Sequence, residues 1–326
     1  MNNKILTLSI AAYNVEKFIE KTLNSCTSIS KEALEKLEIL VVDDGSKDNT
    51  TYIAKSFESK FPQSIRCIVK QNGGHGSTVN YSMSNAVGKY FMLLDGDDWM
   101  DSKQLEKLVN LLENEKSDMV LCPYNMVDNQ SNEVSLINPN QLFDTGLLYE
   151  TKDVLEFVKI YLAGMIIKTS ILQEHPFKLQ ENCFYVDMEY VTFPIPYVKS
   201  IIFYDLVVYQ CRTALHGQST SSIGTFLHAD DHFKVAKSLI DFYTLNKKSD
   251  PVLTQYLFNV TKKVIEDVFL MPFVFPVFDR NIRKRICDFN DYLKINDMDH
   301  YSARYRKKIN FMRKTNYIGW QLFKVF

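Results

Sequence analysis

The first 125 residues alternate between short apolar segments and stretches whose apolar residues recur at helical spacing. Strands that alternate with helices form βαβ units, so the alternation predicts an α/β fold with a mainly parallel sheet flanked by helices. The predicted strands are Ile5–Ile10, Leu37–Val42, Ile65–Val69, Tyr90–Leu94 and Met119–Cys122. Helical spacing begins between them near Val15, Asp48, Ser77 and Ser102.

The pattern changes further along the chain. Between about residues 125 and 222, polar turns separate short mixed segments, which indicates a less regular half of the same domain. After residue 222, Phe226–Leu245, Pro251–Val268 and Arg280–Lys294 have helical spacing. We therefore expect one domain over residues 1–224, with halves 1–125 and 126–224, and a helical C-terminal region over residues 225–326.

Composition excludes several classes of protein. A formal net charge of -1 gives no reason to expect a nucleic-acid partner. The six cysteines include no CxxC pair, which argues against a disulfide framework or a zinc site and indicates a reducing compartment. The start lacks the apolar run of a secretory signal, and no stretch approaches the ~18–20 apolar residues that span a bilayer. We therefore expect a cytoplasmic protein.

Three polar clusters directly follow predicted strands. Ala12–Asn14 follows the first strand, Asp43–Ser46 the second and Asp95–Asp98 the fourth. In an open α/β sheet, ligands bind outside the carboxyl ends of the strands. The shared placement of the clusters therefore predicts a binding site at this edge of the sheet.

The run Asp95-Gly96-Asp97-Asp98 is the most acidic of the three clusters. Closely spaced carboxylates repel one another unless a cation neutralises them. Hard oxygen ligands suit Mg²⁺ or Mn²⁺, whose shells are usually completed by water and substrate phosphates. The run therefore predicts a metal site, and the alternative is a solvated turn before the next helix.

Asp43 and Asp44 directly follow the apolar run Ile39–Val42. One of these two acids can accept a hydrogen bond from a nucleobase. The alternative is a turn, and Asp48 is expected to cap the helix that follows it.

The segment Asn72–Ser77 is rich in glycine and precedes a helical pattern. It contains neither the GxGxxG fingerprint nor the Walker pattern. The amides around Gly73 and Gly76 can still approach a phosphate closely. The alternative is a loop in which Ser77 caps the helix.

Four sequence motifs, taken in their order along the chain, resemble those of glycosyltransferase family 2, which has the GT-A fold. They are AYN at 12–14, VVDDGSKDNT at 41–50, NGGHGSTVN at 72–80 and AVGKYFMLLDGDDW at 86–99. The resemblance implies a GT-A fold with a Rossmann-like sheet. It also implies metal-dependent, inverting transfer of a sugar from a UDP-sugar to a hydroxyl of a saccharide or lipid-linked glycan, in bacterial surface polysaccharide or glycoconjugate synthesis.

The resemblance further implies roles for individual residues at the donor site. Asp44 would contact the base of the nucleotide, and Asp97, with Asp95, would hold Mn²⁺ or Mg²⁺ on the diphosphate. The residues implied to bind the nucleotide sugar are Ala12, Tyr13, Asn14, Asp43, Asp44, Asn72, Gly73, Gly76, Asn80, Asp95, Gly96, Gln218 and Ser219.

A later acid acts as the general base in enzymes of this family. Asp187 is the first candidate for that base and Glu189 the second. The segment Tyr209–Arg212, followed by His216–Ser219, resembles a motif that closes over the diphosphate. His216 is thereby a further candidate metal ligand, and the alternative is a solvated histidine in a polar loop.

The chain departs from the family pattern at three positions. Ala12 stands where proline is usual, Val79 where arginine often precedes the asparagine, and Val186 where glutamate often precedes the base. Two other classes stay open beside a transferase. One is a nucleotidyltransferase, whose glycine-rich basic signature near the first strand is missing; the other is an inactive GT-A-fold protein that binds carbohydrate or acts as a scaffold.

The C-terminal tail combines basic and aromatic residues. Residues 301–326 contain seven lysines and arginines, no acid, and interleaved aromatic residues. This composition suits docking on an anionic membrane surface at the inner face of the cell membrane. The alternative is a helix whose aromatic residues pack on the protein or on another subunit.

Overall fold

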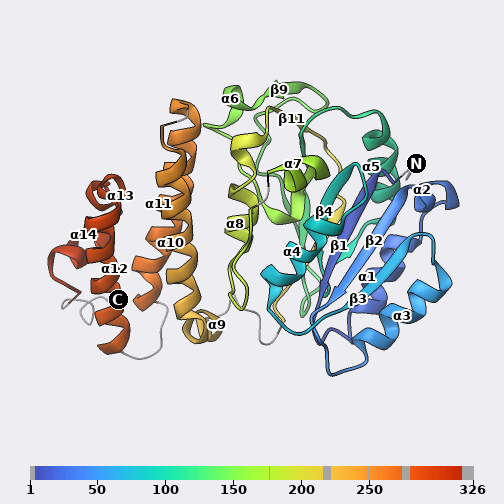
Figure 1. Cartoon of the computed structure of the whole chain (residues 1–326), viewed down its shortest axis with the longest axis horizontal. Coiled ribbons are helices and arrows are strands. Elements are labelled where there is room, and N and C mark those ends of the chain that lie inside the picture. The colour runs from blue at the N-terminus through green and yellow to red at the C-terminus, as the bar shows by residue number, and fades with distance from the viewer. Residues whose placement is uncertain (1–3, 176, 216–221, 249, 274–279, 318–326) are drawn as a thin grey trace. The chain divides into compact units, whose positions relative to one another are not determined.

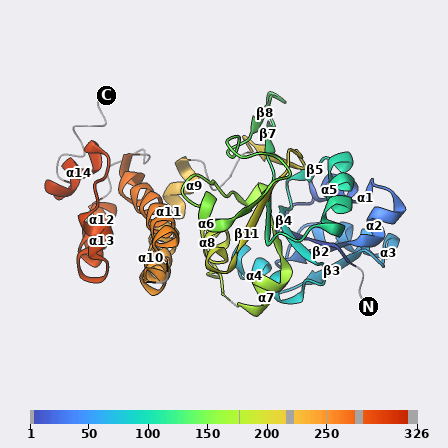
Figure 2. The same ribbon diagram turned by 90° about the horizontal axis from the view of Figure 1, so that it is seen from above.

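The computed structural model describes residues 4–175, 177–215, 222–248, 250–273 and 280–317 (Figures 1 and 2). The chain forms two compact units, Met1–Leu215 and His216–Phe326. The first unit is α/β and the described part of the second is helical. The predicted fold class, a mainly parallel sheet flanked by helices followed by a helical C-terminal region, is therefore confirmed.

The first unit is built around an eight-stranded sheet in the order β3-β2-β1-β4-β10-β6-β11-β9. Its strands are β1 Leu6–Ala12, β2 Leu37–Asp43, β3 Ile65–Val69, β4 Tyr90–Asp95, β6 Met119–Leu121, β9 Leu148–Glu150, β10 Met165–Lys168 and β11 Ser200–Phe203. The first four strands are mutually parallel, β11 is parallel to β6, and β10 and β9 run antiparallel to their neighbours. All five strands predicted from the sequence are present.

Helices cover both faces of this sheet. They are α1 Ile19–Thr27, α2 Lys31–Lys36, α3 Thr50–Lys60, α4 His75–Asn85, α5 Ser102–Asn114, α6 Thr151–Val154, α7 Thr169–Glu174 and α8 Asp187–Thr192, with short 3-10 turns at Leu162–Gly164 and Ile195–Tyr197. Helices α1, α2, α3 and α5 share a core with alternate strand residues such as Leu8 and Met92. On the opposite face, α4 packs against α7, and Tyr190 of α8 packs against Phe91.

Helix α5 illustrates how the sequence determines these elements. Asp101 caps its first turn by accepting a hydrogen bond from the Gln104 amide at 3.0 Å. Its fully buried residues recur every three or four positions; they are Leu105, Leu108, Val109 and Leu112. Each such side chain contributes about 1.5–3 kcal/mol of hydrophobic stabilisation, which holds the helix against the sheet.

A second, four-stranded sheet lies beside the edge where the candidate site is found. Its order is β5-β12-β7-β8, with β5 Trp99–Met100, β7 Tyr124–Asp128, β8 Val134–Ile137 and β12 Tyr209–Thr213. Strand β5 begins directly after the acidic run and pairs with β12. The second sheet therefore links residues about 110 positions apart in the sequence at the acidic run.

The second unit contains α9 Ser222–Leu227, α10 Ala229–Asn246, α11 Pro251–Leu270, α12 Arg280–Asn296, α13 Met298–Ser302 and α14 Lys307–Lys314, with a 3-10 turn at Met271–Phe273. Tyr305 and Tyr317 of the C-terminal tail are buried against Phe269. These two aromatic residues therefore belong to the core of the second unit. Within the described ranges, no helix is long and apolar enough to cross a membrane.

Candidate functional site

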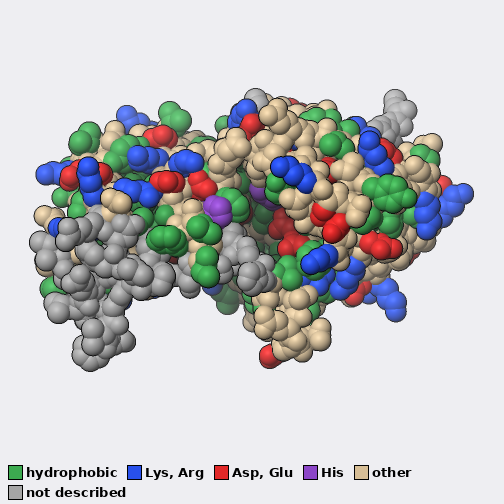
Figure 3. Space-filling model, turned by 90° about the horizontal axis from the view of Figure 1, so that it is seen from below, with side chains coloured by type: hydrophobic (Ala, Val, Ile, Leu, Met, Phe, Trp, Pro, Cys, Tyr) green, Lys and Arg blue, Asp and Glu red, His purple; other side chains and the backbone are tan. Residues whose placement is uncertain are grey.

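The three polar clusters meet at the carboxyl edge of the main sheet. Strands β1, β2 and β4 are parallel and adjacent, so residues that follow them emerge side by side. Backbone hydrogen bonds join the clusters: the Asp44 amide donates to Ala12 O at 2.8 Å, and the Gly96 amide to Ala11 O at 3.0 Å. On the face of the first unit seen in Figure 3, several acidic side chains lie near one another.

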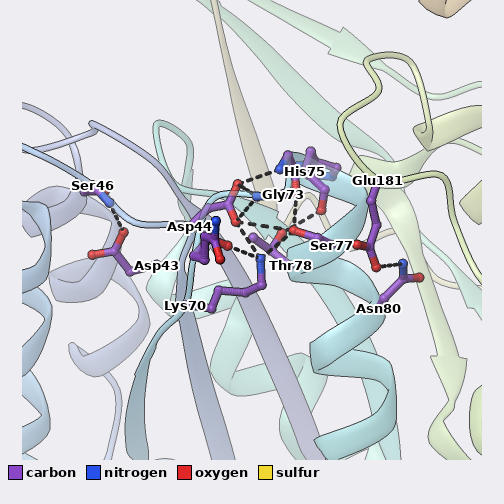
Figure 4. A network of polar contacts seen from close by, with 12 residues as sticks. Asp43, Asp44, Ser46, Lys70, Gly73, His75, Ser77, Thr78, Asn80 and Glu181 are labelled. Atoms are coloured by element: carbon purple, nitrogen blue, oxygen red, sulfur yellow. Dashed lines mark hydrogen bonds and ion pairs between the residues drawn. The ribbon is translucent and has the colours of Figure 1, made fainter.

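Asp44 has an extensive set of internal hydrogen-bond donors. Only 2% of the residue is exposed, and its carboxylate accepts from Lys70 Nζ at 2.8 Å, from the Gly74 amide at 2.7 Å and from the Gly73 amide at 3.0 Å (Figure 4). Ser77 Oγ donates to it at 3.3 Å. Asp44 therefore holds the glycine-rich loop in place. Contact with a nucleobase, the role implied by the family resemblance, stays a prediction.

Asp43 and the first cluster form a second set of structural contacts. The buried Asp43 carboxylate accepts from the Ser46 amide at 2.8 Å and from the Thr51 hydroxyl. Asn14, with a left-handed φ of 53°, accepts from the Lys47 amide at 2.9 Å, and its own amide donates to Ser46 Oγ at 2.9 Å. The loops after β1 and β2 therefore brace each other.

The two other residues of the first cluster, Ala12 and Tyr13, differ in their exposure to solvent. Ala12 is buried at the end of β1, whereas 46% of Tyr13 is exposed. The ring of Tyr13 is therefore available to a ligand at the edge of the sheet. Asp48 accepts a hydrogen bond from the Thr50 amide at 3.0 Å, but the N-cap of α3 is Asn49, so the expected cap by Asp48 is wrong by one residue.

The glycine-rich loop packs tightly against the segment before α8. Gly74, with a φ of 79°, is the N-cap of α4, so the helix begins before Ser77. A Cβ atom on Gly76 would lie 2.0 Å from Gln180 O, and the Asn182 amide donates to Gly73 O at 2.6 Å. Glycine is required at residue 76 because no side chain fits there.

Asn80 adds a further connection between α4 and the same segment. Its side-chain amide donates to Leu179 O at 2.9 Å, and its carbonyl accepts from the Leu179 amide at 2.9 Å. Asn72, by contrast, is exposed. Asn80 and Gly76 therefore fix the segment that carries Asp187, while direct contact of either residue with a nucleotide stays a prediction.

The acidic run after β4 is short of internal donors at two of its carboxylates. Gly96 is buried and lets the chain turn against β1, since a Cβ atom there would lie 2.7 Å from Ala11 O. The Asp95 side chain is 41% exposed. Burial, together with the charge of Asp95, raises the pKa of the Asp97 carboxyl to about 6. Asp95 and Asp97 therefore carry negative charge that the protein does not fully neutralise.

Asp98 is the buried third acid of the run. It accepts hydrogen bonds from Tyr209 Oη at 2.7 Å and from the Arg212 amide at 2.6 Å, both from β12. Burial, with the charges of Asp95 and Asp97, raises the pKa of its carboxyl well above the ordinary value. The guanidinium Nε of Arg212 donates to Asp97 O at 2.7 Å. Strand β12 therefore fixes the backbone that presents Asp97.

The two candidate bases differ in their surroundings although they are two residues apart on α8. Glu189 is fully buried, and its oxygens accept from the Gln180 amide at 2.9 Å and the Gln180 side chain at 2.8 Å. Asp187 is exposed. Desolvation by the surrounding protein still raises the pKa of its carboxyl, an effect that His75 opposes and Asp95 reinforces. Of the two residues, Asp187 is the exposed one and Glu189 is the one bound by Gln180.

Two residues were not assigned roles by the sequence reasoning. Arg212 lies in the segment Tyr209–Arg212, whose motif was noted without a role for the arginine. His75 lies inside the glycine-rich motif; its Nδ1 is 3.8 Å from Asp95 Oδ1. The sequence feature that could have indicated a role for His75 is a histidine between two glycines at the start of a predicted helix.

Some candidates lie outside the described residues, namely His216, Gln218 and Ser219. In the part of the chain that is described, no group of three or more His, Cys, Asp or Glu residues could by itself hold a metal ion. A cavity of about 150 Å³ lies elsewhere in the first unit, lined by residues that include Asn138, Phe143 and Asp205. It does not include any of the acids discussed above.

Comparison with known proteins supports the GT-A architecture. Residues 1–349 of S. aureus TarS in complex with UDP-GlcNAc have a similar fold, with a TM-score of 0.58, 16% identity, and coverage of 98% of this chain and 92% of that one. The mannosyltransferase PcManGT from Pyrobaculum calidifontis, in complex with GDP-Man and Mn²⁺, has a TM-score of 0.50, 13% identity, and coverage of 98% and 87%. Fold and site together define a GT-A-fold domain.

The family follows from the sequence. Residues 7–165 match the profile of glycosyl transferase family 2, so this part of the chain is a family 2 glycosyltransferase domain. The minor teichoic acid biosynthesis protein GgaB of Bacillus subtilis is 25% identical over 253 residues, which cover 75% of this chain and 27% of GgaB. The first curated relatives are bacterial glycosyltransferases 32–40% identical to this chain, which spans 40–42% of their length.

Proposed function

We propose that this protein transfers a sugar from a UDP-sugar to a hydroxyl group of a saccharide or lipid-linked glycan, with inversion and with the help of Mn²⁺ or Mg²⁺. One observation carries the proposal. Asp95 and Asp97 lie at the end of β4 with charge that neighbouring groups do not fully neutralise, and the electrostatic influence of Asp95 reaches the exposed Asp187 on α8. The UDP-GlcNAc bound by the structurally similar TarS supports a UDP-sugar donor.

The residues present fit a divalent metal ion. Asp97 and Asp95 are adjacent carboxylates whose mutual repulsion raises the pKa of Asp97, and a cation relieves that repulsion. Two protein carboxylates suffice for Mg²⁺ or Mn²⁺, which usually take further ligands from substrate phosphates and water. When bound, the ion would stabilise negative charge on the leaving diphosphate. Mn²⁺ in the PcManGT complex supports this choice of ion.

Asp187 is the proposed general base. In the transfer, the acceptor hydroxyl gives its proton to the Asp187 carboxylate while its oxygen bonds to the anomeric carbon. The bond from that carbon to the diphosphate oxygen breaks, and UDP leaves. Positioned proton transfer typically contributes ~10²–10⁴-fold, and a raised carboxyl pKa brings the base nearer to working pH. A product that keeps the anomeric configuration of the donor, seen by NMR, would contradict this displacement.

The acceptor is proposed to belong to a bacterial surface polymer or glycoconjugate, supported by the similarity to GgaB. The basic residues of the tail would then bring the protein to an anionic membrane surface. Arg304, Lys307 and Lys314 are exposed, as is Phe311. Since Tyr305 and Tyr317 are buried, removing the tail would disturb the second unit, so point variants are the better test.

The membrane association is tested by sedimentation with vesicles. Replacing Arg304, Lys307 and Lys314 by glutamine should weaken binding to phosphatidylglycerol vesicles, since each basic residue contributes about 1 kcal/mol at an anionic surface. Binding to neutral phosphatidylcholine vesicles should not change. Equal sedimentation of wild type and variant with the anionic vesicles would contradict the proposal.

The donor is tested by thermal unfolding with UDP, UDP-GlcNAc, UDP-glucose and GDP-mannose, each with and without Mn²⁺. A ligand at 100 times its dissociation constant stabilises the folded state by about 2.7 kcal/mol. We expect a UDP compound to raise the melting temperature of wild type only with Mn²⁺, and not that of Asp97→Ala. If no compound shifts wild type, the alternative of an inactive carbohydrate-binding or scaffolding protein takes first place.

A further inference from the structure

His75 occupies a fixed position beside the acids of the proposed site. The backbone on either side of it is constrained, because Gly74 has a left-handed φ of 79° and Gly76 has no room for a side chain. The carbonyl of His75 also accepts from Thr78 Oγ1 at 2.7 Å. The main chain at residue 75 therefore cannot shift without disturbing the contact between α4 and the segment before α8.

The imidazole of His75 lies beside Asp95, one of the three acids that the proposed reaction uses. Its Nδ1 lies 3.8 Å from Asp95 Oδ1, and the electrostatic influence of the ring extends to Asp97 and Asp187. The side chain is 33% exposed. Nε2, the ring nitrogen on the other side from Nδ1, makes no hydrogen bond to any described residue.

The position of these acids indicates what His75 would touch. In the proposed reaction, Asp95 and Asp97 lie on the side of the diphosphate, and Asp187 lies on the side of the acceptor. The transferred sugar must lie between them, because the bond that breaks and the bond that forms share its anomeric carbon. His75 lies beside Asp95, and the start of its helix packs against the segment that leads to Asp187, so its side chain lies nearer to the sugar than to the nucleobase.

We propose that His75 is a specificity residue that hydrogen-bonds a hydroxyl of the transferred sugar through Nε2. This inference rests on the proposed function and deepens it. Nε2 of an imidazole whose Nδ1 faces a carboxylate can pair with a sugar hydroxyl, which both donates and accepts hydrogen bonds. His75 thereby contributes to choosing among sugars on a common UDP carrier.

The test compares the affinities of UDP and of UDP-sugars in the presence of Mn²⁺. Titration calorimetry would be run on wild type, His75→Ala and His75→Gln with UDP, UDP-GlcNAc, UDP-glucose and UDP-galactose. We expect His75→Ala to weaken the preferred UDP-sugar about fivefold to tenfold, as for one lost hydrogen bond, with UDP changed less than twofold. His75→Gln should retain part of the affinity, since its amide can still accept.

His175→Gln is the matched control, because His175 lies in the same unit with its ring stacked on Tyr197 at 4.0 Å. It should bind both ligands as wild type does. Equal weakening of UDP and the UDP-sugar by His75→Ala, or no change in either, would overturn the assignment to the sugar while leaving the donor site intact. If wild type itself binds no UDP compound, the proposed function fails and this inference with it.

Discussion

The acids after β2 and the acids after β4 look alike in the sequence but have different surroundings. Both groups contain adjacent aspartates beside a glycine, at the end of a buried strand. After β2, Asp43 and Asp44 are buried and bound by internal donors. After β4, the Asp95 side chain is 41% exposed and the pKa of Asp97 is raised, whereas Asp98 accepts hydrogen bonds from Tyr209 and Arg212 of β12.

The difference shows how one fold separates structural from functional carboxylates. A buried carboxylate with several donors fixes a loop, whereas one without donors has a raised pKa and attracts a cation. Helix α8 repeats the contrast, since Glu189 is bound by Gln180 and Asp187 is exposed. We therefore expect replacement by the isosteric amide to change the free energy of unfolding differently for the two kinds of acid.

The largest effect is expected at Asp44. In Asp44→Asn, Lys70 loses its buried partner, and two loop amides face a group that is a weaker acceptor. Breaking a buried ion pair typically costs about 3–5 kcal/mol. Urea unfolding should report a loss of that size at pH 7.5. A loss below about 1 kcal/mol would mean that the carboxylate is not an essential part of the loop.

The next largest loss of stability is expected at Glu189, and not at Asp187, although both acids lie on α8. Glu189→Gln removes the charge from two hydrogen bonds to Gln180, and bonds to charged groups contribute about 1.5–3 kcal/mol each. Asp187→Asn should not destabilise the protein, because the raised pKa of this carboxyl means that its charge costs the folded state stability. Equal destabilisation by the two substitutions, measured in urea, would remove the distinction between them.

Asp97→Asn should have the opposite sign from Asp44→Asn. The pKa of Asp97 is about 6 in the folded state against an ordinary 3.8, so the folded state loses stability as pH rises through this window. Removing the charge should stabilise the metal-free protein by about 1–3 kcal/mol at pH 7.5, and this effect should be lost as pH falls below the ordinary pKa of 3.8.

The same substitution gives a test by metal addition. Mn²⁺ should stabilise wild type at pH 7.5 and leave Asp97→Asn unchanged, and its effect on wild type should fade as pH falls below about 6. Thermal unfolding across this pH range provides the measurement. A metal response that is equal in the two proteins would place the ion elsewhere.

The fold and the placement of the site were accessible from the sequence for local reasons. Apolar runs such as Leu37–Val42 and the glycine turn at Gly96 depend on neighbours in the chain, so their pattern predicts strands and strand ends. The partners of Asp44 and Asp98 are 26 to 114 residues away, and no local pattern encodes them. The antiparallel strand β10 and the sheet containing β12 were missed for the same reason.

Release of UDP from UDP-GlcNAc, with Mn²⁺ and water as acceptor, tests the central claim most directly. The central claim is that the carboxylates with few hydrogen-bond donors from the protein are the ones that act on the UDP-sugar. We predict that Asp187→Asn binds UDP like wild type but forms UDP from UDP-GlcNAc ~10²–10⁴-fold more slowly. We also predict that Asp97→Asn loses Mn²⁺-dependent binding of UDP. Both variants working at the wild-type rate would contradict the account.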